Sequence, residues 1–544
     1  MNTGSIIANL VKPLERQICL AEVHWRDGMI TAINRLGPED ANRSYLLPGF
    51  IDAHVHIESS MLTPCEFARI ACRHGTVATV SDPHEIANVL GLEGIQFMCD
   101  NAQLTPMQIF FGAPSCVPAT PFETAGARLE SEQLEVLFQN GLTSYLSEMM
   151  NYPGVLNNDP QIMAKLALAK RYGCPVDGHA PGLSGEDARR YAEAGISTDH
   201  ECATLAEARD KLAAGMSILI REGSAARNFD ELHPLISEYP EQVMFCSDDK
   251  HPDDLVAGHI NLLAARAVAL GHSVFDVLRC ACINPIDHYR LPLGQLTIGD
   301  RMDAVEVENL KGFSPISTWL GGQKAAQHGT SLLTGIKPVA INRFDTHSIT
   351  IADLEIAASG RKIRVIKALD GDLFTHEVLH KPKVINEKIV PDPERDILLL
   401  TVVNRYQPAK PALAFIEGFG LQQGALASSV AHDSHNIIAV GTDAESVCRA
   451  VNSIIAAQGG IVAVNNEEIE LLPLPVAGLM SDRDGDWVAA HYAKLDAIAK
   501  QMGSSLRAPF MTLSFMALLV IPDLKLSDQG LFDGVRFKFK SLTI

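Results

Sequence analysis

Between residues 49 and 247 the chain repeats one pattern, in which a short apolar run is followed by a longer segment with apolar residues at helical spacing. The eight runs are 49–57, 76–81, 108–113, 143–146, 175–178, 196–199, 216–221 and 243–247. Eight strands alternating with helices over about 200 residues predict an α/β fold of the (β/α)₈ barrel type, with all carboxyl ends of the strands at one face. An open doubly wound sheet is the alternative, but no Gly-x-Gly-x-x-Gly pattern follows the first run.

The regions on either side of the barrel pattern have a different character. A chain of 544 residues is too long for a single hydrophobic core. Residues 1–46 contain short strand-like segments, and residues 291–342 contain strands that we expect to return and complete a small β-sandwich with them. The barrel itself is assigned to residues 47–290. Residues 343–544 predict a separate α+β domain.

Composition and charge exclude several classes of protein. A net charge of −20 without any run of Lys and Arg argues against binding nucleic acid. The longest apolar stretch, 510–521, is about half a membrane span, and the amino terminus lacks a secretory pattern. The 11 scattered cysteines favour reduced thiols and a cytoplasmic location. We therefore expect a small-molecule substrate, no nucleic-acid or membrane partner, and a homo-oligomer, by default a dimer.

Histidines and carboxylates stand at the ends of five of the eight runs. His54 and His56 lie two residues apart in the first run, so both side chains point to the same face of a strand. The fourth, fifth, sixth and eighth runs end at or beside Glu148, His179, His200 and Asp248. Imidazole and carboxylate ligands suit Zn²⁺, Mn²⁺ or Fe²⁺. Because Glu148 can bridge two ions, the pattern predicts a two-metal hydrolytic centre.

Two of these candidate ligands have an acidic neighbour. Glu201 follows His200, and Asp249 follows Asp248. Adjacent side chains of a strand point in opposite directions, so only one of each pair is expected to face the metals. The register of the preceding apolar residues selects His200 and Asp248. The alternative interpretation is that these are separate polar residues, each hydrogen-bonded in its own loop. It is the weaker interpretation because six such groups lie at five strand ends.

Several motifs resemble a known family. The stretch LPGFIDAHVHIE at 47–58 resembles the opening of the amidohydrolase superfamily barrel. Further stretches are similar to the bacterial adenine deaminase family: SDPHEIAN at 81–88, SEMMN at 147–151, DGHAPGLSG at 177–185, TDHE at 198–201, IREGS at 220–224, SDD at 247–249, AHDSHN at 431–436 and LPVAGLMS at 474–481. The similarity covers nearly the whole chain. One departure is Arg301-Met-Asp303, where an aromatic-x-Ala-Asp pattern is expected.

The resemblance implies a reaction and its cofactors. It implies conversion of adenine to hypoxanthine and ammonia in purine salvage, with two divalent ions, Mn²⁺ or Fe²⁺, or else Zn²⁺. It also places Glu148 where many superfamily members carry a carboxylated lysine that bridges the metals. An N6-substituted adenine and a cyclic amide remain alternative substrates. A catalytically inactive barrel kept as a binding protein is the alternative of another class, and filled ligand positions argue against it.

The chemistry assigns roles to two acidic residues. Asp248 is expected to accept the proton of the attacking water. An acid must also protonate the purine ring, and Glu186, in the loop after His179, is the candidate. The alternative is that Glu186 only stabilises the first turn of a helix that begins near Gly185.

Other polar residues fall at the same predicted face. Asp82 and His84 follow the second run, and Arg221 ends the seventh, so each is expected to contact substrate or to hydrogen-bond the ligands. His432 and His435 resemble a ligand cluster. A polar surface loop, a lid over the barrel mouth and a separate metal site all remain open for this pair.

Overall fold

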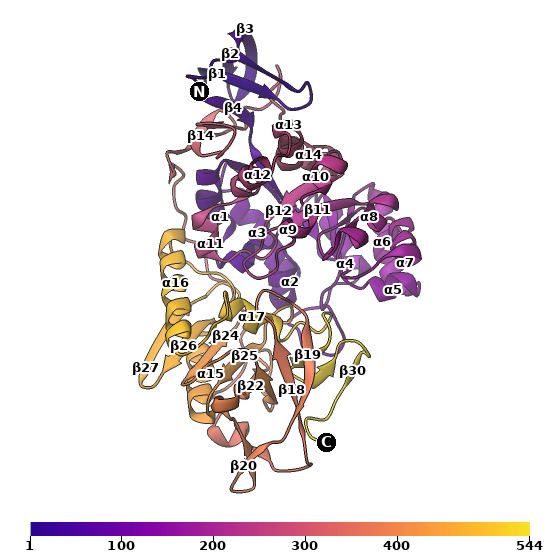
Figure 1. The fold of residues 1–544 in the computed structure, drawn as a ribbon, viewed down its shortest axis with the longest axis vertical. Helices are drawn as coiled ribbons and strands as arrows, with labels where there is room; N and C mark the ends of the chain where they lie inside the picture. The colour runs from indigo at the N-terminus through magenta and orange to yellow at the C-terminus, as the bar shows by residue number, and fades with distance from the viewer. Residues whose placement is uncertain (1) are drawn as a thin grey trace.

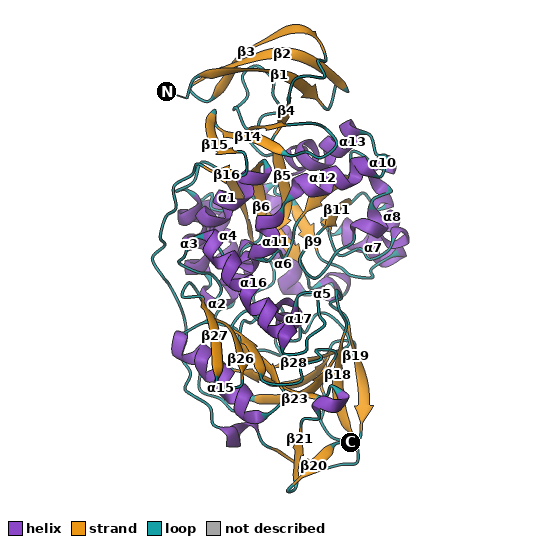
Figure 2. Cartoon of the chain, turned by 60° about the vertical axis from the view of Figure 1, so that its left-hand side comes forward, coloured by secondary structure: helices purple, strands orange, loops and turns teal. Residues whose placement is uncertain are grey.

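The computed structural model describes residues 2–544, and its fold is mixed α/β, as predicted. Figure 1 shows a sheet at one end, a helix-rich middle and a second sheet-containing unit at the other end. Figure 2 shows the same order after a turn about the vertical axis. The middle unit therefore contacts a β-rich region on each side.

The middle unit is built on parallel strands. One sheet contains β5 (Phe50–Val55), β6 (Thr76–Ser81), β7 (Gln108–Ala113), β8 (Tyr145–Met149) and β9 (Val176–Gly178), and another contains β10 (Thr198–Asp199), β11 (Ser217–Arg221) and β12 (Val243–Cys246). At one seam the Ser197 amide donates to the Val176 carbonyl at 2.8 Å. At the other seam Val55 forms a parallel bridge with Asp248. The eight strands thus follow one another around a ring, and each predicted run contains or overlaps one of them.

Helices follow the strands around this ring. Their bounds are α1 (Pro64–Ala71), α2 (His84–Leu90), α3 (Leu92–Ala102), α4 (Ser131–Gln139), α5 (Tyr152–Leu156), α6 (Pro160–Tyr172), α7 (Gly185–Glu193), α8 (Leu205–Ala213), α9 (Phe229–Leu232), α10 (Leu235–Glu238), α11 (Pro252–Ala257), α12 (Ile260–Ala269), α13 (Val274–Leu278) and α14 (Asn284–Tyr289). In α6 the Asp159 side chain caps the first turn, Pro160 is the first helical residue, and Gly173 ends the helix with φ +67°. Its buried face repeats at helical spacing through Ile162 and Leu166.

The amino-terminal unit is a single eight-stranded sheet. It contains β1 (Gly4–Lys12), β2 (Gln17–Arg26), β3 (Met29–Pro38), β4 (Tyr45–Pro48), β13 (Ala304–Val307), β14 (Pro315–Leu320), β15 (Gln323–Gln327) and β16 (Thr330–Ser331). The strands after the barrel do return to this unit. Because β4 pairs with both β1 and β13, all eight strands form one continuous hydrogen-bonded sheet, and its arrangement as a sandwich stays a prediction.

The carboxyl-terminal region is organised around another eight-stranded sheet. Its order is β19 (Thr375–His380), β18 (Ile363–Ala368), β23 (Ala412–Glu417), β22 (Leu398–Val403), β25 (Ile437–Gly441), β24 (Ala425–Ser428), β26 (Gly460–Asn465) and β27 (Glu468–Pro473). Two small sheets comprise β17 (Ile356–Ala357), β20 (Lys383–Ile385) and β21 (Lys388–Val390), and β28 (Leu524–Ser527), β29 (Gly530–Asp533) and β30 (Lys538–Phe539). Helix α15 (Ala444–Ala457) packs on β24, β25 and β26.

Two further helices lie near the barrel. Helix α16 (Gly485–Gln501) contacts α1 and α11, and the apolar segment at 510–521 forms most of α17 (Pro509–Phe515). Figure 2 shows α17 between the barrel helices and the carboxyl-terminal strands. Among the described residues, no helix combines the length and apolar character needed to span a bilayer.

Candidate metal centre and its cavity

The six predicted ligands converge in the structure, although they come from five strand ends. His54 lies in β5 and His56 directly follows it, and their Nε2 atoms are 3.2 Å apart. The others are Glu148 in β8, His179 just after β9, His200 just after β10 and Asp248 beyond β12. None of the six is more than 7% exposed. The carboxyl ends of the strands therefore carry a buried cluster of nitrogen and oxygen atoms.

Glu148 lies at the centre of this cluster. Its Oε2 is 2.9 Å from His179 Nδ1, 3.1 Å from His200 Nε2 and 4.0 Å from His54 Nε2. Its Oε1 is 3.5 Å from His56 Nε2. One carboxylate thus faces all four histidines of the predicted ligand set, with its two oxygens turned toward different histidines. This is the position that a bridging ligand requires.

Asp248 is held against the same histidines by its backbone. Its amide donates to the His54 carbonyl at 2.9 Å, and its φ of +54° turns the chain there. Oδ1 is 3.3 Å from His56 Nε2, while Oδ2 accepts from Arg221 Nη1 at 2.5 Å. Burial raises the pKa of this carboxyl, but Arg221 and the histidines outweigh burial and hold the pKa well below its ordinary value.

The donor set fits divalent cations. Single ligand atoms of His54, Glu148 and His200 lie within 4.8 Å of one another, and so do those of His54, His56 and Asp248. The buried His179 Nε2 and His54 Nδ1 have no hydrogen-bond partner within residues 2–544. Two histidine Nε2 atoms facing each other at 3.2 Å cannot both be donors. Cations between these atoms would relieve that conflict.

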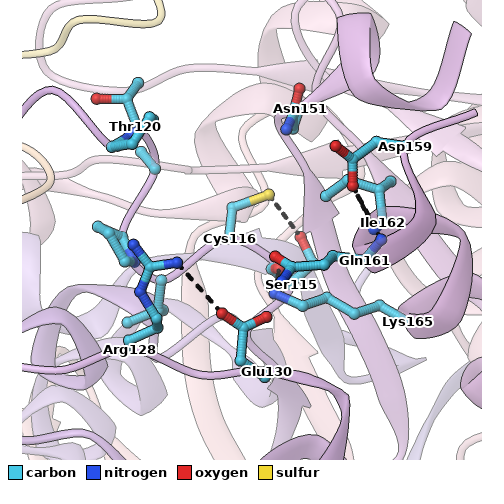
Figure 3. A pocket seen from close by; sticks show the side chains of 14 residues that line it. Ser115, Cys116, Thr120, Arg128, Glu130, Asn151, Asp159, Gln161, Ile162 and Lys165 are labelled. Carbon is cyan, nitrogen blue, oxygen red and sulfur yellow. Dashed lines mark hydrogen bonds and ion pairs between the residues drawn. The ribbon is translucent and has the colours of Figure 1, made fainter. Parts of the chain in front are cut away.

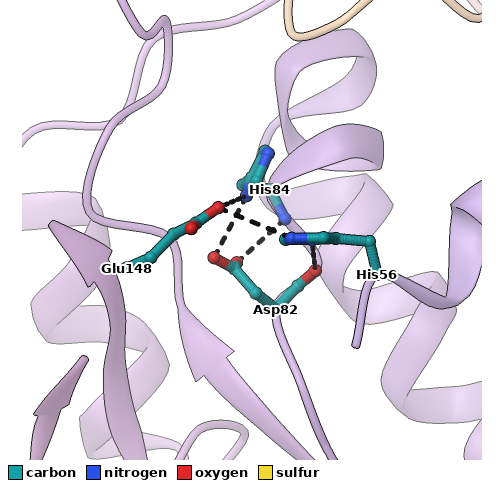
Figure 4. A group of neighbouring side chains, drawn as sticks. All are labelled: His56, Asp82, His84 and Glu148. Carbon is teal, nitrogen blue, oxygen red and sulfur yellow. Dashed lines mark hydrogen bonds and ion pairs between the residues drawn. The ribbon is translucent and has the colours of Figure 1, made fainter. Parts of the chain in front are cut away.

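Asp82, just after β6, and His84, the first residue of α2, join the cluster, as Figure 4 shows. His84 Nδ1 lies 3.0 Å from Asp82 Oδ2 and 3.3 Å from Glu148 Oε1. His56 Nδ1 lies 3.2 Å from the Asp82 carbonyl oxygen. These two residues, predicted as substrate contacts, thus lie against the predicted ligands, where they fix the orientation of His56 and Glu148.

Arg221 and two acidic neighbours complete the barrel side of the cavity. Arg221 pairs with both Asp248 and Glu201, and Glu201 Oε1 is 3.5 Å from His200 Nε2. Asp249 also lines the cavity and accepts from Ser59 Oγ at 2.5 Å. The prediction that only one member of each acidic pair faces the site is wrong. The reason is that β10 ends at Asp199 and β12 at Cys246, so strand alternation no longer applies beyond them.

Glu186 does not join the site. It lies in the first turn of α7 with 66% of its side chain exposed, and both carboxylate oxygens are bonded to Arg189. The predicted role as an acid facing the substrate is therefore corrected, and the helix-terminus interpretation fits its position. The prediction relied on the short sequence distance between His179 and Glu186. It was wrong because the loop between them places the first turn of α7 at the solvent-exposed surface.

The carboxyl-terminal region forms the opposite wall of the cavity. The wall residues are Leu373, His432, Asp433, Phe515 and Leu518. His432 and His435 both bond the carboxylate of Glu85, which belongs to α2 of the barrel. Of the three interpretations of His432 and His435, the cover over the barrel mouth matches this placement. Glu85 was missed because nothing local in the sequence pairs it with residues about 350 positions away.

A second cavity lies between the segment 115–130, which joins β7 to α4, and helix α6, and Figure 3 shows its lining. Its buried cation, Lys165, donates to the carbonyls of Ser115 and Leu129, each at 2.8 Å. None of the predicted ligands lines this cavity. It is therefore not the metal centre.

Comparisons with known proteins agree with the geometry. Residues 45–325 match the model of the amidohydrolase family, and residues 372–538 match the adenine deaminase C-terminal domain. The adenine deaminase of Salinibacter ruber is 52% identical over 537 residues, covering 98% of each chain, and that of Sulfurovum sp. is 52% identical over 534 residues, also covering 98% of each. The chain belongs to the adenine deaminase family.

Membership in this family bears on the cluster. Amidohydrolase-family proteins use divalent metals, and the buried groups described above are candidates to hold them. Among solved structures, the D-hydantoinase from Thermus sp. aligns with a TM-score of 0.46 and 15% identity, covering 60% of this chain and 96% of that one.

Proposed function

We propose that this chain hydrolyses adenine to hypoxanthine and ammonia, using two divalent metal ions, Mn²⁺ or Fe²⁺, with Zn²⁺ as a further possibility. The proposed ligands are His54, His56, Glu148, His179, His200 and Asp248. One observation carries the proposal: six buried groups with nitrogen and oxygen ligand atoms, Glu148 at their centre, converge in a chain similar over nearly its whole length to adenine deaminases.

The barrel residues divide the chemical work. When bound, the metal ions supply a water acidic enough to act as a nucleophile near neutral pH. Asp248 stays ionised because its pKa is held low, so it can accept a proton from that water. Arg221 fixes Oδ2 and leaves Oδ1 facing the histidines. Glu201 accepts hydrogen bonds from both terminal nitrogens of the guanidinium and holds it in place.

The opposite wall suits a flat aromatic substrate. Leu373, Phe515 and Leu518 present apolar surface to the cavity, whereas the barrel wall is almost entirely polar. A purine ring can pack its faces on apolar and aromatic side chains while its amidine carbon reaches the polar wall. These side chains also exclude water from the reacting atoms, which strengthens the electrostatic interactions there.

Product analysis tests the proposal. Metal-loaded protein is incubated separately with adenine, N6-methyladenine, hydantoin and dihydrouracil, and ammonia, methylamine and ring-opened acids are measured. We expect ammonia and hypoxanthine from adenine and no ring opening of the cyclic amides. Release of methylamine at a comparable rate would favour the N6-substituted alternative. Ring opening of a cyclic amide with adenine untouched would overturn the proposal.

The metal requirement has its own test. Protein stripped with a chelator is reloaded with Mn²⁺, Fe²⁺ or Zn²⁺, and metal per chain is measured by elemental analysis beside activity. We expect two equivalents per chain and activity that returns in proportion to them. Activity that persists in metal-free protein would overturn this part.

The proposal extends to the organisation of the chain. Residues 47–290 form a (β/α)₈ barrel that carries the chemistry. Residues 1–46 and 291–342 together form a supporting β-unit, and residues 343–544 close the cavity. The proposal also includes a homodimer working in purine salvage in the cytoplasm, without nucleic-acid or membrane partners. Light scattering and cell fractionation test these points, and a monomer or a membrane-bound fraction would contradict them.

A further inference from the structure

The loop between β24 and β25 reaches from the carboxyl-terminal sheet to the barrel. His432 in this loop is 2% exposed, and its Nδ1 is bonded to Glu85 Oε1. Its ring stacks on Phe515, with centroids 4.6 Å apart and planes 16° apart. The ring is therefore fixed on one edge by a carboxylate and on one face by an aromatic side chain.

The free edge of His432 belongs to the metal-centre cavity. Its Nε2 is buried and has no hydrogen-bond partner within the described chain, and the residue lines the same cavity as Glu148 and Asp248. The neighbouring Asp433 also lines the cavity, and its Oδ2 is likewise buried without a partner in residues 2–544. Buried polar atoms are rarely left unpaired, so these two call for partners on a bound molecule.

His435, on the same loop, provides an internal contrast. Its Nδ1 accepts from the Ala431 amide at 3.2 Å, so its only proton is on Nε2, which is bonded to Glu85 Oε2. Both of its nitrogens are occupied, and it does not line the cavity. Two histidines thus share one carboxylate, and only His432 presents a nitrogen to the substrate space.

The surroundings of His432 favour a proton on that nitrogen. Burial lowers the pKa of His432, but Glu85 on α2, Asp249 after β12 and Asp433 on its own loop raise the pKa to about 9. His435, whose pKa is lowered, is the opposing basic neighbour on the loop. With Nδ1–H donated to Glu85, the second proton of the imidazolium is on Nε2 and faces the cavity.

On the basis of the proposed function, we propose that His432 is the acid that protonates N1 of the purine ring, supplied to the barrel by the carboxyl-terminal region. The water oxygen bonds to C6, the electron pair of the C6–N1 double bond moves to N1, and N1 takes the proton from His432 Nε2. One water proton passes by way of Asp248 to the amino group. The C6–N bond then breaks, its electron pair stays on nitrogen, and ammonia leaves.

The remaining protons complete the balance. The second water proton is lost to solvent from the new C6 hydroxyl as the carbonyl forms, and solvent returns one proton to His432. Hypoxanthine keeps the proton on N1, so adenine and water yield hypoxanthine and ammonia. The other acidic groups are less suited, because Glu201 is bonded to Arg221 and Asp249 accepts from Ser59.

The decisive experiment compares His432→Gln with His435→Gln in Mn²⁺-loaded protein. Glutamine can still donate a hydrogen bond but cannot transfer a proton. We expect His432→Gln to lower kcat about 10²- to 10³-fold while two metals per chain are retained. We expect His435→Gln to lose less than about tenfold, because its nitrogens serve only the loop and Glu85.

The pH profile distinguishes an acid from a structural residue. In the parent protein kcat/KM should fall at alkaline pH as His432 loses its proton. This alkaline limb should vanish in His432→Gln and persist in His435→Gln. Glu85→Gln removes the carboxylate that raises the His432 pKa, so it should move the limb to lower pH. If His432→Gln folds poorly, the shift of the alkaline limb in Glu85→Gln still tests the role of His432.

The outcomes separate this inference from the proposed function. If the parent protein releases no ammonia from adenine, the proposed function fails and this inference falls with it. If the parent is active but His432→Gln retains both its rate and its alkaline limb, only the role of His432 is overturned. Loss of a third metal equivalent per chain in His432→Gln would also overturn it, because the cluster with Glu85 would then be a cation site.

Discussion

The two walls of the cavity are built on opposite plans. The barrel wall concentrates five imidazoles around one carboxylate, and each group lies at or shortly after a strand end. The carboxyl-terminal wall has three apolar side chains and only two polar ones, His432 and Asp433. The barrel wall can activate a nucleophile, whereas the other wall can hold a flat ring and deliver a proton.

The difference has a physical origin in the two scaffolds. Strand ends of a closed parallel ring point several side chains at one spot, which suits multidentate binding of cations. A loop between antiparallel strands brings few groups, but it can reach across to another region. We therefore expect the barrel wall to bind the metal ions and the carboxyl-terminal wall to close the cavity over the substrate. Substitutions on the barrel wall should mainly change metal content, and substitutions on the other wall should mainly change substrate binding and proton transfer.

The largest effect is expected for Glu148→Gln on the barrel wall. The amide cannot bridge two cations, so metal content should fall and ammonia release should drop by at least about 10³-fold. Asp82→Asn is the matched control, because Asp82 orients His84 and should cost only about 10–100-fold. Elemental analysis and an ammonia assay check both. Two metals and near-normal activity in Glu148→Gln would break the assignment of a binding role to this wall.

Arg221→Met should mainly reduce stability. It leaves Glu201 and Asp248 as buried carboxylates without their cation, so the free energy of unfolding of metal-free protein should fall by about 3–5 kcal/mol. Arg189→Met removes an exposed pair with Glu186 and should leave the free energy of unfolding nearly unchanged. Urea unfolding measures both variants. Equal losses would show that burial of the barrel wall does not set the energy of its ion pairs.

The carboxyl-terminal wall depends on a buried lysine. Lys525 donates to the carbonyls of Leu373 and Phe515, at 2.7 and 3.1 Å, and burial lowers its pKa to about 7. In the unfolded chain this group titrates near 10.4, so between about pH 7 and 10.4 the unfolded chain binds more protons and stability rises with pH. The burial penalty is thus full below the folded pKa and disappears above the unfolded one.

The comparison of Lys525→Met with the parent protein isolates this contribution. From pH 7.5 to 9.5 the stability of the parent relative to the variant should increase by about 2 kcal/mol. Urea midpoints at the two pH values measure it. An unchanged or reversed difference would show that Lys525 stays charged in the folded protein.

Phe515→Leu should weaken substrate binding more than chemistry. Leucine keeps the apolar contact but loses the flat ring, so KM for adenine should rise about tenfold while kcat changes less. Phe419→Leu, at an equally buried site away from the cavity, should leave KM unchanged. Steady-state kinetics measure both variants. A fall in kcat with constant KM would assign Phe515 to positioning His432 rather than to binding the ring.

The sequence predicted the barrel wall well because its information is local. His54 and His56 are brought together by strand alternation alone, and Glu148 and Asp248 end apolar runs whose order around a ring follows the sequence. Prediction became less reliable where a strand stopped. Beyond Asp199 and Cys246 the chain is no longer in a strand, so successive side chains need not alternate between two faces. The orientations of Glu201 and Asp249 could therefore not be derived from strand alternation.

The opposite wall could not be predicted in the same way. The contact between Glu85 and His432 joins residues 347 positions apart and depends on how the carboxyl-terminal region packs against the barrel. The sequence indicated that His432 and His435 form a polar cluster, but it did not identify Glu85 as their partner. Its candidate acid, Glu186, followed from spacing along the chain, whereas the position of the acid is decided by which region closes the cavity.

The smallest effect is expected for Glu186→Gln. Within residues 2–544 its carboxylate is bonded only to Arg189, on the surface of α7, so kcat and KM should stay within about twofold of the parent values. Kinetics beside Glu148→Gln, the same replacement inside the barrel wall, provide the contrast. A large loss of kcat with both metals retained would require α7 to move its first turn into the cavity. The barrel would then supply the acid as well as the nucleophile, and the division of roles between the two walls would be lost.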